Sequence, residues 1–179
     1  MNRNKFLRPL IVFAIPVLIL IALAVPPVWT TLFGEEIKIR TAPIDPTDLF
    51  RGSYVALGYE IESVTLDQLD ETVKSDFHSK NVGVYKNVYV SLKQDSNGHY
   101  GVHHVSKEKP DEDMYLKGKL QIPYDLQRAS SIHIEYGLDN YYAPKDRALE
   151  LEMSAATKTA MAVVKVKNGN AVLQEIIVP

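Results

Sequence analysis

The feature that most constrains this chain is a long uncharged stretch near its N-terminus. From Pro9 to Gly34 there are 26 residues without a charged side chain, and Leu10–Leu23 is almost continuously aliphatic. About 20 apolar residues cross the hydrocarbon layer of a membrane as a helix. We therefore expect residues 9–34 to form a transmembrane helix, residues 1–8 a short basic N-terminus, and residues 35–179 one domain.

The charges that flank this stretch predict its orientation. Arg3, Lys5 and Arg8 precede it, and no acidic residue occurs before Glu35. Positively charged flanks stay in the cytoplasm, and tryptophan is enriched at the membrane–water interface, where Trp29 would lie. We expect a single-pass protein of the cell membrane, with a cytoplasmic N-terminus and an extracytoplasmic domain.

Two other interpretations of the segment remain open. Ala22-Leu23-Ala24 is an A-x-A triplet after a basic start and an apolar stretch, as in a cleaved signal peptide. Against cleavage, the uncharged run continues for ten residues beyond Ala24 and includes Pro26-Pro27. The segment would alternatively be a core helix of the domain, although one-sided basic flanks are unnecessary there.

Charge and cysteine content exclude several classes of function for the domain. Residues 35–179 carry 17 basic and 22 acidic side chains, and the chain contains no cysteine. Such an acidic domain lacks the basic surface of a nucleic-acid-binding protein. Disulfides, thiolate metal sites and cysteine nucleophiles are absent as well.

The sequence pattern of the remaining chain predicts short strands separated by turn residues. Asp95-Ser96-Asn97-Gly98 and Asn168-Gly169 each separate alternating segments, which predicts two hairpins. Val88, Val90 and Leu92 are expected to point into the core. The strands are expected at 37–40, 54–61, 85–93, 99–105, 114–122, 131–136, 162–167 and 171–178.

Two short helices complete the predicted elements. Leu66–Phe77 has helical spacing at Leu66, Leu69 and Val73, and residues 148–157 are expected to form the second helix. The fold class is therefore mainly β (β-rich α+β). The domain is expected to be an antiparallel sheet, a sandwich or a partly open barrel with one or two short helices.

Four stretches together resemble a known family. They are Thr41–Tyr59, Tyr115–Leu120, Ile134–Lys145 and Val163–Leu173. Their order and content are similar to the bacterial GDYXXLXY family of membrane-anchored proteins, named for a Gly-Asp-Tyr-x-x-Leu-x-Tyr motif. The resemblance covers nearly the whole domain after the apolar stretch. It implies no assigned activity, and it implies association with multi-spanning membrane proteins.

The chain departs from the family motif at one position. Gly52, Tyr54, Leu57 and Tyr59 fit the motif, but Ser53 stands where the family has aspartate. Any acid–base or metal-binding role of that carboxylate would therefore be lost in this chain.

The segment that leads into the motif is a candidate recognition loop. Asp45 and Asp48 suit Asx-type turns, Pro46 presets one φ angle, and Arg51 can pair with either carboxylate. Gly52 permits a positive φ before the next strand. A rigid structural corner is the plainer interpretation, and partner recognition is the functional one.

Tyrosines form the second group of candidate binding residues. Tyr54 and Tyr59 are five residues apart, so one would face the core and the other would be available. Tyr136, Tyr141 and Tyr142 cluster beside Gly137 and Pro144. Aromatic rings next to a turn usually cover the edge of a core, and they also suit a platform for carbohydrate or peptide.

The patterns for metal binding and catalysis are weak. His103 and His104 are adjacent on a strand and point to opposite faces, and His99 is about 13 Å from His103 at strand rise. Neither pair suits one zinc ion, and we expect no metal or other cofactor. Ser154 and Lys158 have the i, i+4 spacing of a Ser–Lys dyad but no accompanying oxyanion element.

The sequence therefore favours a non-enzymatic function. We expect an accessory or assembly domain that is anchored in the membrane and packs on a polytopic membrane protein. The alternatives are an exported Ser–Lys hydrolase and a cell-surface module that binds a ligand through the region from Tyr136 to Tyr142.

Overall fold

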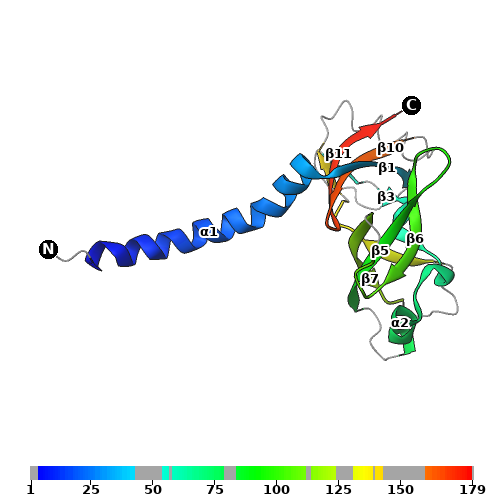
Figure 1. The fold of residues 1–179 in the computed structure, drawn as a ribbon, viewed down its shortest axis with the longest axis horizontal. Helices are drawn as coiled ribbons and strands as arrows, with labels where there is room; N and C mark the ends of the chain where they lie inside the picture. Colours follow the sequence, from blue (N-terminus) through cyan, green and yellow to red (C-terminus); the bar gives the residue numbers. More distant parts are fainter. Residues whose placement is uncertain are drawn as a thin grey trace.

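The computed structural model describes residues 4–42, 54–56, 58–78, 84–111, 114–123, 131–138, 140–142 and 160–178. It describes the backbone but not the side chains at 4–11, 54–56, 78 and 140–142. A long helix, α1 (Asn4–Phe33), projects from a mainly β domain (Figure 1).

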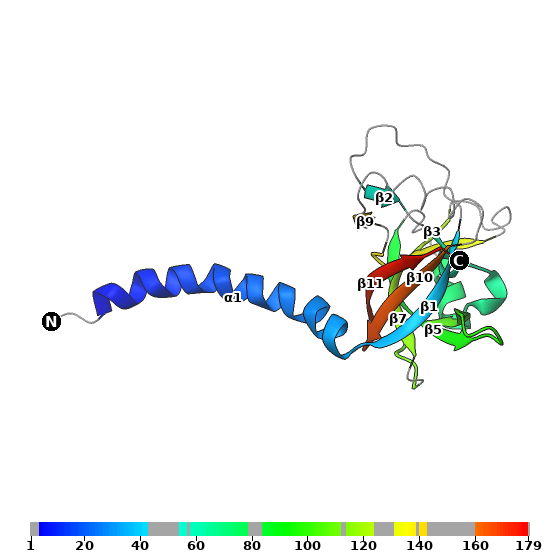
Figure 2. The ribbon, with the colours of Figure 1, turned by 90° about the horizontal axis from the view of Figure 1, so that it is seen from above.

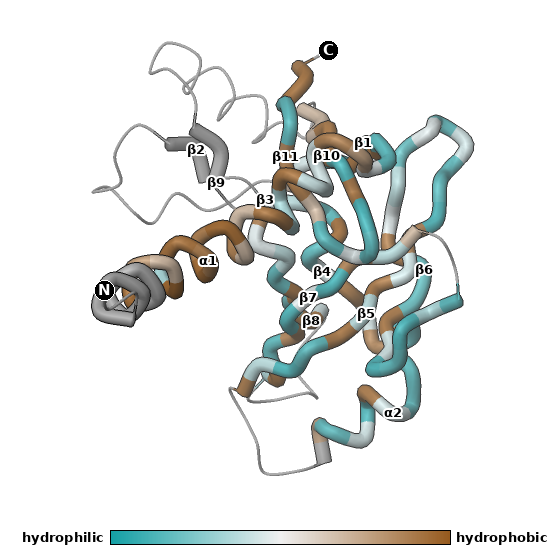
Figure 3. The backbone as a smooth tube through the Cα atoms, turned by 60° about the vertical axis from the view of Figure 1, so that its left-hand side comes forward, coloured by the Kyte–Doolittle hydropathy of each residue, from teal (hydrophilic) through white to brown (hydrophobic). Residues whose placement is uncertain are grey.

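Helix α1 contains one segment, Val12–Phe33, that is long and apolar enough to cross a membrane. Its side chains are exposed from Val12 to Trp29. The interpretation as a core helix of the domain is therefore wrong. Figure 2 shows that α1 curves along its length, and Figure 3 shows that the coloured part of α1 is mostly hydrophobic.

The strands form two larger sheets and one small ribbon. The first sheet has the order β11-β10-β1-β3, the second β4-β8-β7-β5-β6, and the ribbon pairs β2 with β9. Their bounds are β1 Glu35–Ala42, β2 Tyr54–Ala56, β3 Gly58–Tyr59, β4 Ser63–Val64, β5 Tyr85–Gln94, β6 Tyr100–Ser106, β7 Tyr115–Gln121, β8 Ile132–Glu135, β9 Asn140–Tyr142, β10 Met161–Lys167 and β11 Asn170–Ile177.

Alternating side chains place one shared core between the two larger sheets. Ile37 and Ile39 of β1 are 1% and 0% exposed, whereas Glu36 and Lys38, which alternate with them, are exposed. Val88, Val90 and Leu92 of β5 are buried, as predicted. The turn of the β10–β11 hairpin closes one end of the core, because Gly169 forms an isolated bridge with Leu116 of β7.

Both predicted hairpins are confirmed. The β5–β6 pair flanks the turn that contains Asn97 and Gly98, and the β10–β11 pair flanks Asn168-Gly169. Asn168 and Gly169 have φ angles of 51° and 78°. Consecutive positive φ angles characterise type I′ turns, whose twist matches the flanking strands.

The predicted strand at 54–61 is not continuous. Tyr54–Ala56 pairs with β9, Gly58–Tyr59 pairs with β1, and Glu60–Glu62 forms a 3-10 turn, η1. The Glu62 carboxylate accepts a hydrogen bond from the backbone N–H of Tyr59 at 3.1 Å, which turns the chain at this point. Leu57 lies outside the described residues.

The predicted helix at 66–77 is also divided. It consists of η2 (Leu66–Gln68), α2 (Glu71–Lys74) and η3 (Ser75–His78). Leu69 and Val73 are buried as expected, but Leu66 is 38% exposed. The backbone N–H of Asp70 donates to Val105 O on β6 at 2.9 Å, and this bond to the sheet interrupts the helix. The helix expected at 148–157 lies outside the described residues.

Candidate functional site

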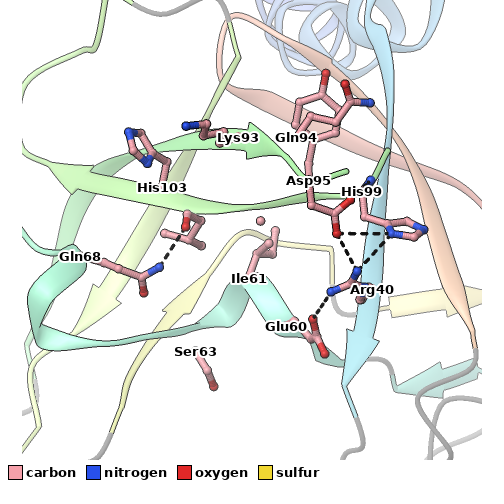
Figure 4. A pocket seen from close by; sticks show the side chains of 13 residues that line it. Arg40, Glu60, Ile61, Ser63, Gln68, Lys93, Gln94, Asp95, His99 and His103 are labelled. Carbon is pink, nitrogen blue, oxygen red and sulfur yellow. Dashed lines mark hydrogen bonds and ion pairs between the residues drawn. The ribbon is translucent and has the colours of Figure 1, made fainter. Parts of the chain in front are cut away.

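A polar groove lies between the β5–β6 hairpin and the segment that follows β3. Its volume is about 410 Å³. Figure 4 shows the side chains that line it: Arg40 from β1, Glu60, Ile61, Ser63 and Gln68 from the segment after β3, and Lys93, Gln94, Asp95, His99, Tyr100, Gly101, Val102 and His103 from the hairpin.

Arg40 connects the two walls of this groove. Its Nη2 donates to Asp95 Oδ2 at 2.6 Å and lies 3.3 Å from His99 Nδ1, while its Nη1 is 3.8 Å from Glu60 Oε2. Arg40 points away from the core because Ile37 and Ile39 occupy the inner face of β1. A single guanidinium therefore holds the tip of the β5–β6 hairpin against β1 and η1.

Asp95 is held as an anion by the turn that contains it. Its Oδ1 accepts hydrogen bonds from His99 N at 2.9 Å and Asn97 N at 2.8 Å. The bond from the His99 backbone is the largest cause that lowers the pKa of Asp95, and the bond from Asn97 and the charge of Arg40 act in the same direction against desolvation. At neutral pH the guanidinium thus faces the ionised carboxylate of Asp95, and the Glu60 side chain lies on its other side.

The opposite end of the groove is fixed by a hydrogen bond of Gln68 and carries two exposed side chains, Lys93 and His103. Gln68 Nε2 donates to Val102 O at 2.9 Å and fixes η2 against β6. Lys93 and His103 are exposed, and neither takes part in an ion pair within the described residues. Among the described residues, no group of three His, Cys, Asp or Glu side chains could hold a metal ion. This arrangement suits recognition by charge and hydrogen bonding.

The last tyrosine of the motif serves the core. Tyr59 is 1% exposed, and its hydroxyl donates to Leu138 O at 2.9 Å. Any contribution of Tyr59 to partner recognition would therefore act through the backbone that it positions. Tyr136 supports the same region, because its hydroxyl donates to Ile61 O at 2.9 Å. Burial, and secondarily the charge of Glu62, raise the pKa of Tyr136, so its hydroxyl remains a donor.

The structure brings together some of the predicted recognition residues. In the β2–β9 ribbon Tyr54 is paired with Tyr142, and Tyr141 is paired with Val55. The side chains of these tyrosines lie outside the described part of the chain. Asp45, Asp48, Arg51, Gly52 and Ser53 lie outside it as well, as do Ser154 and Lys158 of the candidate dyad. Their proposed roles remain predictions.

A second groove, of about 440 Å³, lies beside Tyr136 on the five-stranded sheet. Gly118 of β7 lies in it and leaves no room for a side chain, because a Cβ there would lie 2.5 Å from the buried Ile134 Cγ2 and 3.2 Å from Tyr136 Cε1. The lining residues are Asn87, Val88, Tyr89, Lys117, Gly118, Lys119, Glu135, Tyr136 and Gly137.

The sequence did not point to Arg40 or Glu60 as site residues. The sequence identified Asp95 only as a turn residue. Arg40 lies 55 residues before Asp95 in the chain, so no local pattern links the two residues. One signal was available in principle: Arg40 alternates with buried isoleucines on β1, so its side chain had to lie on the outer face. Its partners there depend on the packing of the hairpin against β1.

One of three comparisons with known proteins identifies a family. A search of curated proteins and a search of solved structures each found no match. The family model described as "GDYXXLXY protein" matches residues 16–176, which is most of the chain. This match includes Gly52, Tyr54, Leu57 and Tyr59 of the motif and the strands that surround the groove. The chain therefore belongs to the GDYXXLXY protein family.

Proposed function

We propose that this protein is a non-enzymatic accessory subunit of a polytopic membrane protein. Helix α1 anchors it in the cell membrane with a cytoplasmic N-terminus, and the β domain packs on the extracytoplasmic part of its partner. The observation that carries this proposal is the junction between α1 and the domain, which contains no flexible linker.

The junction is short and well packed. Helix α1 ends at Phe33 and β1 begins at Glu35. The backbone N–H of Gly34 donates to Thr30 O at 2.8 Å, and Thr30 is 1% exposed. The end of α1 packs against β10 and β11. The helix axis and the domain therefore form one body.

A fixed junction favours association with a neighbour in the same membrane. Binding costs translational and rotational freedom, and a preorganised partner loses less of it. A domain held at one height and one orientation presents the same surface to each membrane protein that it meets. A domain that acts on a free substrate or ligand does not need such a fixed orientation, because a flexible tether would serve it as well as a rigid junction.

The polar groove is the surface best suited to this contact. Arg40 and the β5–β6 tip lie toward the end of β1 that is remote from α1 (Figure 1). The candidate loop with Asp45, Asp48 and Arg51 follows β1 directly in the chain. Charged groups that become buried in a complex contribute to specificity, and the loss of one partner increases the dissociation rate.

Affinity purification of the full chain from its own membranes tests the proposal, with the co-purified polytopic protein identified by mass spectrometry. A flexible Gly-Ser insertion between Phe33 and Gly34 should reduce the amount of that protein several-fold. Asp48→Ala, Arg51→Ala and Arg40→Ala should increase its dissociation rate. Ser53→Ala and Ser154→Ala are the matched controls and should leave both association and cellular role intact.

A different outcome would favour the Ser–Lys hydrolase. If Ser154→Ala abolished the cellular role while folding and partner association stayed normal, the proposed function would be wrong. Loss of a nucleophile removes the chemical step almost completely, whereas loss of one contact weakens binding by degrees.

A second candidate function is a surface module that binds carbohydrate or peptide. The groove beside Tyr136 favours it, because aromatic and charged side chains meet there over the small residue Gly118. Soluble oligosaccharides and peptides that raise the melting temperature of the full chain, but not that of Tyr89→Ala, which removes an aromatic side chain from the lining, would support this candidate.

A further inference from the structure

The turn of the β10–β11 hairpin lies at the level of the end of the membrane helix. Strand β10 runs antiparallel to β1, with Val166 opposite Glu35. One further step in the same register brings Lys167 level with Gly34, and the next brings Asn168 level with Phe33. Figures 1 and 2 show this end of the hairpin beside the end of α1.

Contacts at Gly34 confirm that the hairpin and the helix end are adjacent. A Cβ placed on Gly34 would lie 3.1 Å from Val166 N and 3.2 Å from Lys165 Cβ. Trp29 and Phe33, whose ring centroids are 4.4 Å apart, are both more than half exposed on the last turns of α1. Aromatic rings at the end of a membrane helix are typical of the headgroup region.

Strand β7 adds another lysine to this turn. The backbone N–H of Lys117 donates to Gly169 O at 2.8 Å. Gly169 lies so close to β7 that a Cβ there would be 2.9 Å from Lys117 Cγ. Lys117 and Lys167 therefore flank the same turn, one from each of the two larger sheets.

These two lysines differ from their neighbours in charge compensation. Lys165 stands opposite Glu36, and Lys119 stands opposite Glu135. Lys117 stands opposite Tyr89, and Lys167 stands opposite Asn170. The difference lies in the cross-strand neighbours, since none of these four lysines forms an ion pair among the described side chains. Glu35 is level with the hairpin turn, but its side chain lies on the opposite face of β1 from that of Glu36. Lys165 and Lys167 lie on the same face as Glu36, so Glu35 is on the other face from Lys167.

We propose that Lys117 and Lys167 bind the phosphate groups of anionic lipid headgroups in the extracytoplasmic leaflet. The inference rests on the membrane attachment proposed above. Each ammonium group offers three donors without a carboxylate opposite it. The domain as a whole is acidic, so an anionic bilayer would otherwise repel it. The two lysines attach the hairpin turn to the leaflet and fix the tilt of the domain against the membrane.

The single tryptophan of the chain provides a direct test. The full chain is reconstituted in vesicles of 70% phosphatidylcholine and 30% phosphatidylglycerol, with a trace of either lipid carrying pyrene on an acyl chain. Energy transfer from Trp29 to pyrene then reports which lipid is enriched next to the helix end. Because each lysine at a membrane surface favours anionic lipid by about fivefold, we expect stronger transfer to pyrene-phosphatidylglycerol.

Matched variants locate the effect. The double variant Lys117→Gln/Lys167→Gln should make transfer to the two labelled lipids equal. Lys38→Gln/Lys119→Gln removes the same charge elsewhere and should preserve the preference. Raising the salt concentration to about 0.5 M should weaken the preference, because screening then acts over a few ångströms.

The test separates failure of this inference from failure of the membrane attachment. Vesicle flotation is measured on the same samples. If the protein floats with the vesicles but transfers energy equally to both lipids, or if the double variant retains the preference, the inference is wrong. If the protein does not float with either kind of vesicle, the membrane attachment itself is wrong.

Discussion

At the scale of single residues, buried hydroxyl groups hold the motif segment in place. Tyr59 and Tyr136 donate to Leu138 O and Ile61 O, which lie 79 and 75 residues away in the chain. The first bond joins β3, and the second joins η1, to the residues that follow β8. The last tyrosine of the family motif thus contributes a core position and a long-range hydrogen bond, a structural role that also brings Glu60 to the groove.

Tyr59→Phe should lower the free energy of unfolding by about 1–3 kcal/mol. The substitution keeps the ring but leaves the buried carbonyl of Leu138 without this donor, and an unsatisfied buried polar group costs about that much. Urea unfolding of the full chain in detergent, followed by circular dichroism, measures the effect. Tyr89→Phe is the control, since the Tyr89 ring is half-buried and no hydrogen bond of its hydroxyl occurs among the described residues. Equal stability of the two variants would contradict the role given to Tyr59.

At the scale of elements, two glycines permit close contacts that position the hairpin and the helix. Gly169 allows the β10–β11 turn to approach β7, where Tyr115 Cε2 would lie only 2.6 Å from an added Cβ. Gly34 allows the last turn of α1 to meet β10. A Cβ on Gly34 would overlap Thr30 O, a backbone atom that cannot rotate away.

Gly34→Ala should therefore destabilise the junction by about 1–3 kcal/mol, the usual cost of overpacking. The helix end and β10 must separate to admit the methyl group, so Trp29 fluorescence should also change. Gly101→Ala is the matched control, because a Cβ at Gly101 meets no atom within 4 Å. Urea titration monitored at Trp29 measures both variants. A Gly34→Ala midpoint equal to that of Gly101→Ala would show that the junction is less tightly packed than described.

At the scale of the whole molecule, the distribution of charge along the chain fits one orientation across a membrane. Basic residues lie at the N-terminal end of α1, and an acidic domain follows the helix. The β5–β6 tip, with exposed Asn97, lies at the side of the domain away from α1 (Figure 1). Because the chain contains no cysteine, one introduced thiol labels a single known position.

Asn97→Cys should react with a membrane-impermeant thiol reagent on intact cells. The basic residues that precede the apolar stretch are expected to stay in the cytoplasm, which places the β domain outside. Asn4→Cys, at the start of α1, is the control and should react only after lysis. Gel-shift labelling before and after lysis measures both. Reaction of Asn97→Cys only in lysed cells would place the domain in the cytoplasm and refute the topology.

Local patterns were sufficient to predict much of the fold. The uncharged run predicted α1, the Asn-Gly pairs predicted both hairpins, and alternation predicted which residues of β1 and β5 face the core. Each of these features depends on residues close together in the sequence. They fail where a distant contact competes: the bond from Asp70 N to Val105 O divides the helix predicted at 66–77. Pairing of neighbouring residues with different sheets divides the strand predicted at 54–61.

By itself, the sequence determined the apolar helix, the mainly β class and the positions of the turns, because short-range periodicity and turn chemistry specify them. Only the tertiary structure decided which side chains meet. Arg40 and Asp95 are 55 residues apart, and Lys117 and Gly169 are brought together by the closure of one sheet against the other. Such pairs depend on how whole sheets pack, and packing depends on the shape and burial of many residues at once.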